Sequence, residues 1–140
     1  MEEYFNFISN NPVLFLLFFI ILGFIIFNEY KTLTQKFKNI TPQDAVFLIN
    51  KNAFILDVRE SSELNHGIIK DSKHINFSSV QTSLDSIKKY SERPTIVYCK
   101  SGSRSATISN ILSKNNFSEV YSMKGGFEAW VSDNLPVVKS

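Results

Sequence analysis

The fold of this chain is decided by the stretch Cys99-Lys100-Ser101-Gly102-Ser103-Arg104-Ser105, which holds its only cysteine. The stretch follows an apolar, β-branched run at residues 95–98, which predicts a buried strand. It precedes residues 106–112, whose apolar side chains recur at helical spacing. Cys99 is therefore expected at the carboxyl end of a strand, on a turn that opens a helix. Ligands bind at this position in open α/β sheets.

The chemistry of this turn favours an anion. Backbone N–H groups converge at its centre, and the dipole of the following helix adds partial positive charge. Gly102 allows a tight backbone turn, and Lys100 and Arg104 add full positive charges. A thiol in this cradle loses its proton easily, so Cys99 is predicted to be a nucleophile that reacts as a thiolate. The alternative is a small buried core residue, as many free cysteines are.

Composition narrows the classes of function. The chain has 140 residues, enough for one domain and a small additional segment, and its net charge of +2 is too weak to indicate nucleic-acid binding. One cysteine excludes an internal disulfide, a multi-cysteine zinc site and a CxxC redox pair. Two histidines, His66 and His74, are too few for a metal site, and we expect neither a metal nor a cofactor.

Residues 12–30 predict a transmembrane helix. Residues 12–27 carry no charge, and residues 13–22 are an unbroken apolar run. A helix over 12–30 would be ~28 Å long, close to the ~30 Å hydrocarbon core of a bilayer. The main alternative is a cleaved signal peptide, which needs a positive leader and small residues at the cleavage site. Here Glu2 and Glu3 precede the segment, and it ends in Ile25-Ile26-Phe27-Asn28-Glu29. Neither requirement is met, so we expect an uncleaved membrane anchor.

The cations that flank this segment predict its orientation. None precedes it, whereas Lys31, Lys36 and Lys38 follow it closely. We therefore expect a short extracytoplasmic N-terminus at residues 1–11, the membrane helix at 12–30, a basic linker at 31–40 and a domain at 41–140 in the cytoplasm. The protein is then a single-pass protein of the inner (cytoplasmic) membrane.

Strands alternate with helices after residue 40. Thr41-Pro42-Gln43-Asp44 is typical of a helix start, and residues 53–58 and 120–123 predict strands. We also expect a short strand at 75–77, and helices at 84–90, 105–115 and 127–131. This alternation predicts an α/β fold with a mainly parallel sheet covered on both faces.

These motifs together resemble the rhodanese-like domains over about the last hundred residues. They fall in that family's order and spacing: Phe54-Ile55-Leu56-Asp57-Val58-Arg59-Glu60, His66-Gly67-Ile68-Ile69, His74-Ile75-Asn76, the Cys99 loop and Gly125-Gly126-Phe127-Glu128-Ala129-Trp130. The resemblance implies a three-layer α/β sandwich with a five-stranded parallel sheet. One such domain behind a membrane helix resembles the membrane-anchored bacterial members.

The resemblance also implies sulfurtransferase chemistry. Cys99 would attack a sulfane sulfur donor such as thiosulfate, hold a persulfide, and pass the sulfur to cyanide, a thiol or a protein acceptor. Lys100, Ser101, Gly102, Ser103 and Arg104 would form the anion-binding cradle, with Arg104 at the donor's sulfonate.

Asp57 and Arg59 are supporting candidates. We expect both to hold loops in place through hydrogen bonds or a salt bridge rather than to transfer protons, although Arg59 is also a candidate for the mouth of the site. Phe127 and Trp130 are expected to pack in the core.

Two alternatives to the enzyme are considered. One is a non-enzymatic rhodanese-like module that docks a partner at the membrane. The other is a phosphatase or arsenate reductase. Four residues separate Cys99 from Arg104 here, whereas related phosphatases have five, and the shorter loop favours sulfur over a phosphoryl group.

Overall fold

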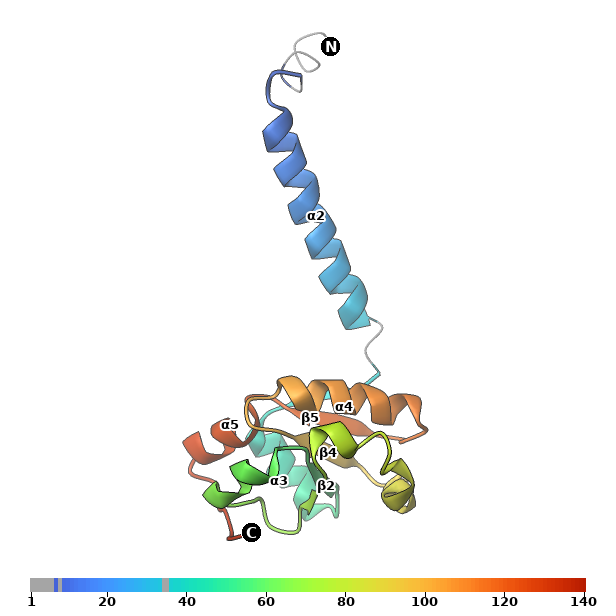
Figure 1. Ribbon diagram of the computed structural model, residues 1–140, viewed down its shortest axis with the longest axis vertical. Helices are drawn as coiled ribbons and strands as arrows, with labels where there is room; N and C mark the ends of the chain where they lie inside the picture. The colour runs from blue at the N-terminus through green and yellow to red at the C-terminus, as the bar shows by residue number, and fades with distance from the viewer. Residues whose placement is uncertain (1–6, 8, 34–35) are drawn as a thin grey trace. The chain divides into compact units, whose positions relative to one another are not determined.

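The computed structural model describes residues 7, 9–33 and 36–140. The chain divides into two compact units, Met1–Gln35 and Lys36–Ser140. The first contains one long helix, α2 (Pro12–Leu33), with proline at its first position, where the missing N–H costs no hydrogen bond (Figure 1). Within α2, Pro12–Tyr30 is long and apolar enough to cross a membrane, and none of it is buried.

The second unit is built on a five-stranded parallel sheet in the order β1-β5-β4-β2-β3. The strands are β1 (Lys38–Ile40), β2 (Phe54–Asp57), β3 (Lys73–His74), β4 (Thr95–Tyr98) and β5 (Val120–Met123). This confirms the predicted fold class. The prediction missed β1, because its residues were assigned to the basic linker at 31–40. The strand expected at 75–77 is also wrong, since the strand ends at His74 and Phe77 begins a 3₁₀ turn, η2 (Phe77–Ser79).

The helices match the predicted pattern with one exception. The α-helices are α3 (Pro42–Asn50), α4 (Ser103–Lys114) and α5 (Gly126–Ser132). Thr41 caps α3 through a reciprocal capping box with Asp44, which explains why that helix begins where the sequence predicts. The helix expected at 84–90 is instead two 3₁₀ turns, η3 (Leu84–Ser86) and η4 (Lys88–Tyr90).

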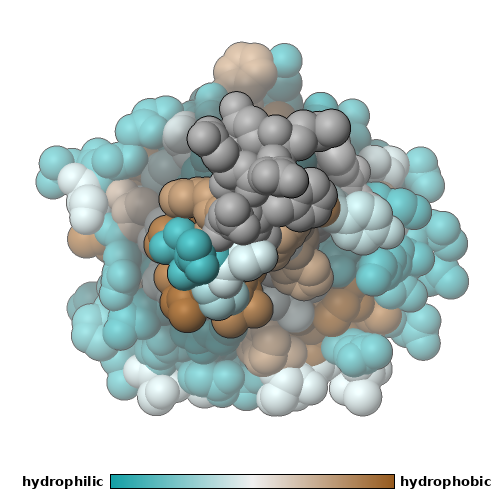
Figure 2. All heavy atoms as spheres, turned by 90° about the horizontal axis from the view of Figure 1, so that it is seen from above, coloured by the Kyte–Doolittle hydropathy of each residue, from teal (hydrophilic) through white to brown (hydrophobic). Residues whose placement is uncertain are grey.

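Two hydrophobic clusters cover the two faces of the sheet, because alternate strand residues point to opposite sides. Leu56 and Val97 pack with Ile108 and Leu112 of α4 on one face. Ile55 and Ile96 pack on the other face, against α3 and α5. Figure 1 shows α4 and α3 on opposite sides of the strands. Hydrophilic residues make up most of the rim in the space-filling view (Figure 2). The layers are those of a three-layer sandwich.

Candidate functional site

The loop at residues 99–104 connects the carboxyl end of β4 to the first turn of α4, as predicted. Gly102 precedes α4 with φ +104°, a left-handed conformation that L side chains rarely adopt. This turn brings the Gly102 N–H to Cys99, whose Sγ accepts it at 3.0 Å. A backbone donor aimed at the sulfur stabilises negative charge on it.

The first turn of α5 braces this loop from the other side. The backbone N–H groups of Phe127 and Glu128 donate to the carbonyl oxygens of Cys99 and Lys100, at 2.7 and 3.1 Å. Gly126 allows this approach, because a Cβ on it would collide with both carbonyl oxygens. Gly125-Gly126 is among the motifs that resemble the family, but the sequence did not predict this contact. The loop is therefore held by backbone hydrogen bonds from two elements.

Cys99 is fully buried and belongs to the hydrophobic cluster on the α4 side of the sheet. This burial fits the alternative of a core cysteine, whereas the hydrogen bond from Gly102 fits the predicted nucleophile. None of the Cys99 surface is exposed to solvent, so a sulfur donor can reach Sγ only after neighbouring atoms move.

The remaining loop residues differ in their surroundings. Lys100, Ser101 and Ser103 are exposed, and Lys100 Nζ lies 3.8 Å from a carboxylate oxygen of Glu128. Ser105, which the sequence analysis did not single out, is buried and donates to the Gly102 carbonyl oxygen at 2.9 Å. It thereby supports the left-handed turn from inside.

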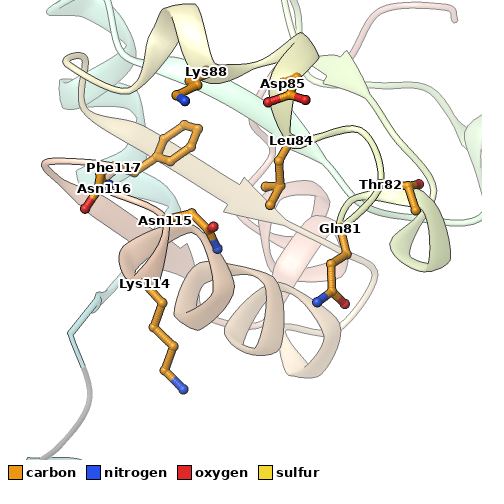
Figure 3. Close-up of a pocket in the computed structure, with 9 residues that line it drawn as sticks. All are labelled: Gln81, Thr82, Leu84, Asp85, Lys88, Lys114, Asn115, Asn116 and Phe117. Carbon is orange, nitrogen blue, oxygen red and sulfur yellow. The ribbon is translucent and has the colours of Figure 1, made fainter.

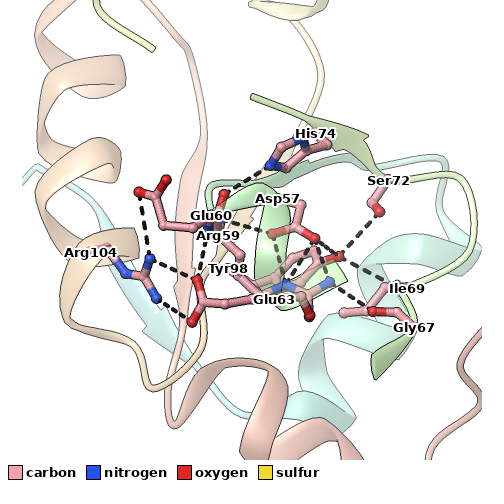
Figure 4. Close-up of polar contacts among 10 residues, drawn as sticks. All are labelled: Asp57, Arg59, Glu60, Glu63, Gly67, Ile69, Ser72, His74, Tyr98 and Arg104. Carbon is pink, nitrogen blue, oxygen red and sulfur yellow. Dashed lines mark hydrogen bonds and ion pairs between the residues drawn. The ribbon is translucent and has the colours of Figure 1, made fainter. Parts of the chain in front are cut away.

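Arg104 is engaged by carboxylates from η1 (Ser61–His66) and the residue before it. Its Nη1 and Nη2 lie 2.9 Å from the two carboxylate oxygens of Glu63, and Glu60 lies 3.9 Å away (Figure 4). The bond to Arg104 holds the pKa of the Glu63 carboxyl below its usual value. The sequence analysis did not single out either glutamate as a partner of Arg104.

Asp57 and Arg59 form a buried ion pair, as expected for a structural role. Arg59 Nη2 donates to Asp57 at 2.7 Å, and the Tyr98 hydroxyl donates to the same carboxylate at 2.7 Å (Figure 4). Arg59 also donates to the carbonyl oxygens of Glu63 and Gly67. Burial, with the Asp57 charge next, raises the pKa of Tyr98, so its hydroxyl remains a donor. The pair thus ties η1 to the end of the sheet.

A cavity of about 540 Å³ borders these groups. Its lining includes the charged side chains of Arg59, Glu63 and Lys100 and the apolar side chains of Phe127 and Val131. Arg59 therefore lines this cavity as well as forming the ion pair. Its guanidinium carbon lies 4.0 Å from the centroid of the Phe127 ring, over the face of the ring. Phe127 and Trp130 are buried, as predicted.

A second hollow, of about 290 Å³, lies at the other end of α4 (Figure 3). Leu84, Lys114 and Phe117 are among its lining residues. Lys114 ends α4, whereas the Cys99 loop precedes that helix, and a helix of this length spans ~18 Å. This hollow is separate from the candidate site.

Comparison with known proteins identifies the family. Residues 41–133 match the sequence profile of the rhodanese-like domain. The chain belongs to the rhodanese-like family. This rhodanese-like chain is 30% identical over 141 residues to the uncharacterized protein YibN of Escherichia coli, and the match covers 99% of each chain.

Two further relatives match mainly the rhodanese-like domain. The thiosulfate sulfurtransferase GlpE of Glaesserella parasuis is 36% identical over 104 residues, which cover 74% of this chain and 94% of the relative. The crystal structure of a rhodanese-related protein from Thermoplasma volcanium superimposes with a TM-score of 0.68 at 30% identity. That match covers 74% of this chain and 100% of the other. The rhodanese-like fold and family are therefore established, while YibN, which matches the whole chain, has no assigned activity.

Proposed function

We propose that this protein is a sulfurtransferase that carries sulfane sulfur as a persulfide on Cys99. The observation that carries the proposal is the hydrogen bond from the Gly102 N–H to Cys99 Sγ, in a loop that opens α4 at the end of β4. Similarity to relatives named thiosulfate sulfurtransferase supports the same chemistry.

The transfer has two balanced steps. The Cys99 thiolate attacks the outer sulfur of thiosulfate; the new S–S bond forms as the bond to the sulfonate sulfur breaks, and sulfite leaves with the electron pair. A thiolate or cyanide acceptor then attacks the outer sulfur of the persulfide, and Cys99 leaves as its thiolate. The Gly102 N–H stabilises the charge on Cys99 Sγ at both stages.

Intact-mass measurement after incubation with thiosulfate tests the proposal. The native protein should gain about 32 Da, the mass of one sulfur atom, and a reducing thiol should remove it. Cys99→Ala should gain nothing, and thiocyanate formation from thiosulfate and cyanide should be lost in the same variant. A native protein with reduced Cys99 that gains no sulfur from either thiosulfate or an organic persulfide would refute the proposed sulfurtransferase function.

The second candidate is a non-enzymatic module that docks a partner, and the complete burial of Cys99 favours it. In that case Cys99→Ala would leave the cellular phenotype unchanged. If the protein acts as an enzyme, the Cys99→Ala phenotype should match that of a deletion of the gene.

Membrane anchoring through α2 is the second part of the proposal. Pro12–Tyr30 is apolar and unburied, and Lys31, Lys36 and Lys38 follow it in the sequence, which favours a cytoplasmic rhodanese-like domain. The protein should remain with the membrane fraction after carbonate extraction, and a reporter fused after Ser140 should be active in the cytoplasm. Reporter activity on the far side alone would overturn the topology.

A further inference from the structure

Three cations near the Cys99 loop are paired with carboxylates. The pairs are Arg59 with Asp57, Arg104 with Glu63 and Glu60, and Lys100 with Glu128. Three cations against four carboxylates leave this set with one net negative charge before Cys99 ionises. The sequence predicts a positive cradle, because it shows Lys100 and Arg104 without their partners. An incoming dianion instead meets an Arg104 guanidinium that is already paired with carboxylates.

Among these ion pairs, the pair between Arg104 and Glu63 has the shortest contacts beside the Cys99 loop. Its two parallel contacts of 2.9 Å are bidentate, and both side chains are about three-quarters buried, at 27% and 23% exposed. Bidentate pairs of this kind are strong and directional. Lys100 and Glu128, at 3.8 Å and 58% exposed each, form a much weaker pair. An anion that needs the Arg104 fork must therefore displace Glu63.

Glu63 is itself held in place. Its carboxylate accepts the backbone N–H of Glu60 at 2.8 Å, and its carbonyl oxygen accepts Arg59 Nη1 at 3.1 Å. Since Arg59 is buried against Asp57, this part of η1 is tied to the sheet. These hydrogen bonds hold the Glu63 carboxylate in a defined position beside Arg104.

We propose that Glu63 determines the class of sulfur donor: it disfavours dianionic thiosulfate and leaves the site suited to an organic persulfide, whose carrier group has little charge. This inference rests on the proposed sulfurtransferase function. Repulsion between like charges acts strongly on a dianion within a few ångströms and only weakly on a donor with one charge or none.

The cavity beside the loop supports an organic carrier. Phe127 and the exposed side chain of Val131 line it, together with charged residues that include Lys100, Glu63 and Glu128. Its volume of about 540 Å³ far exceeds what a small inorganic anion fills. Apolar walls next to the reactive loop favour the carbon skeleton of a thiol carrier.

The transfer from such a donor balances without a further reactant. Cys99 thiolate attacks the outer sulfur of R–S–SH; the bond between the two donor sulfurs breaks as the new S–S bond to Cys99 forms. The carrier leaves as the thiolate R–S⁻ with the electron pair, and the proton stays on the transferred sulfur.

Steady-state kinetics with two donors test the proposal. The donors are thiosulfate and the persulfide of N-acetylcysteine methyl ester, with cyanide as the acceptor. Glu63→Gln keeps the shape of the side chain and removes its charge. It should lower the KM for thiosulfate roughly tenfold with little change in kcat, and change kcat/KM for the persulfide less than about twofold. Glu92→Gln makes the same charge change at an exposed residue before β4, and should alter neither donor.

The possible outcomes separate the two proposals. An unchanged or higher KM for thiosulfate in Glu63→Gln overturns the role of Glu63. If that variant fails to fold, Glu60→Gln, which removes the more distant carboxylate, should lower the KM for thiosulfate about twofold, and no change there overturns the proposal. Absence of Cys99-dependent sulfur transfer from both donors refutes the proposed function instead.

Discussion

Two arginine–carboxylate ion pairs contact η1, and their surroundings give them different roles. Asp57 and Arg59 are 0% and 1% exposed and share their charges with Tyr98 and backbone carbonyls. Glu63 and Arg104 are about a quarter exposed and lie beside the reactive loop. Removing one member of a fully buried pair leaves an uncompensated charge, whereas water can replace a partly exposed partner. The first pair therefore supports the fold, and the second can be used to select a ligand.

The largest expected effect is on the buried pair. Asp57→Ala should lower the free energy of unfolding by about 3–5 kcal/mol, because it leaves the Arg59 guanidinium buried without its counter-charge. Chemical denaturation of the unit Lys36–Ser140 measures this. The double variant Asp57→Ala/Arg59→Met should lose less than the sum of the two single variants. Additive losses would show that the two side chains are not coupled.

A smaller loss is expected from Tyr98→Phe, which removes the hydroxyl that donates to Asp57 at 2.7 Å and keeps the buried ring. The variant should lose ~1–2 kcal/mol of stability, since the carboxylate retains Arg59. Thermal unfolding monitored by circular dichroism measures it. Tyr121→Phe, at a more exposed hydroxyl bonded to Glu119, is the matched control and should have little effect. Equal losses in both variants would contradict the special position of Tyr98.

The smallest effect is expected at the partly exposed pair, and it depends on pH. Because Arg104 lowers the pKa of Glu63 in the folded state, the pair stabilises the fold above the ordinary value near 4.5. This contribution is lost as the pH falls through the lowered folded value. Glu63→Gln should therefore cost at most ~1 kcal/mol at pH 7, and this cost should shrink as the pH falls below 4.5. Denaturation midpoints of both proteins across this range measure the difference, and a constant difference would exclude the linkage.

Much of the fold could be predicted because its signals are local. The capping box at Thr41 and Asp44 lies within one helical turn, and the apolar run at residues 95–98 forms a strand on its own pattern. Strand β1 was missed for the opposite reason. Lys38–Ile40 contains one apolar residue and becomes a strand only by pairing with Tyr121–Met123 of β5, far along the chain. The residues of β1 do not predict a strand by themselves, because the strand forms only through pairing with β5.

In the candidate site, too, local features could be predicted from the sequence and long-range contacts could not. The position of Cys99 after a strand and before a helix could be predicted, because Gly102 and the flanking periodicities are adjacent in the sequence. The carboxylate partners of Arg104 could not be predicted from the sequence. Glu63 is 41 residues away, and nothing in the local pattern distinguishes it from other charged loop residues.

The sequence by itself determined the apolar segment at 12–30, the alternation of strands and helices, and the placement of the one cysteine on a glycine-containing turn. Each of these follows from patterns among residues that are neighbours in the sequence. Only the tertiary structure decided that α5 braces the loop through Gly126 and that Glu63 neutralises Arg104. These contacts join segments that are brought together by the packing of the sheet, so the charge of the site is a property of the fold rather than of the loop.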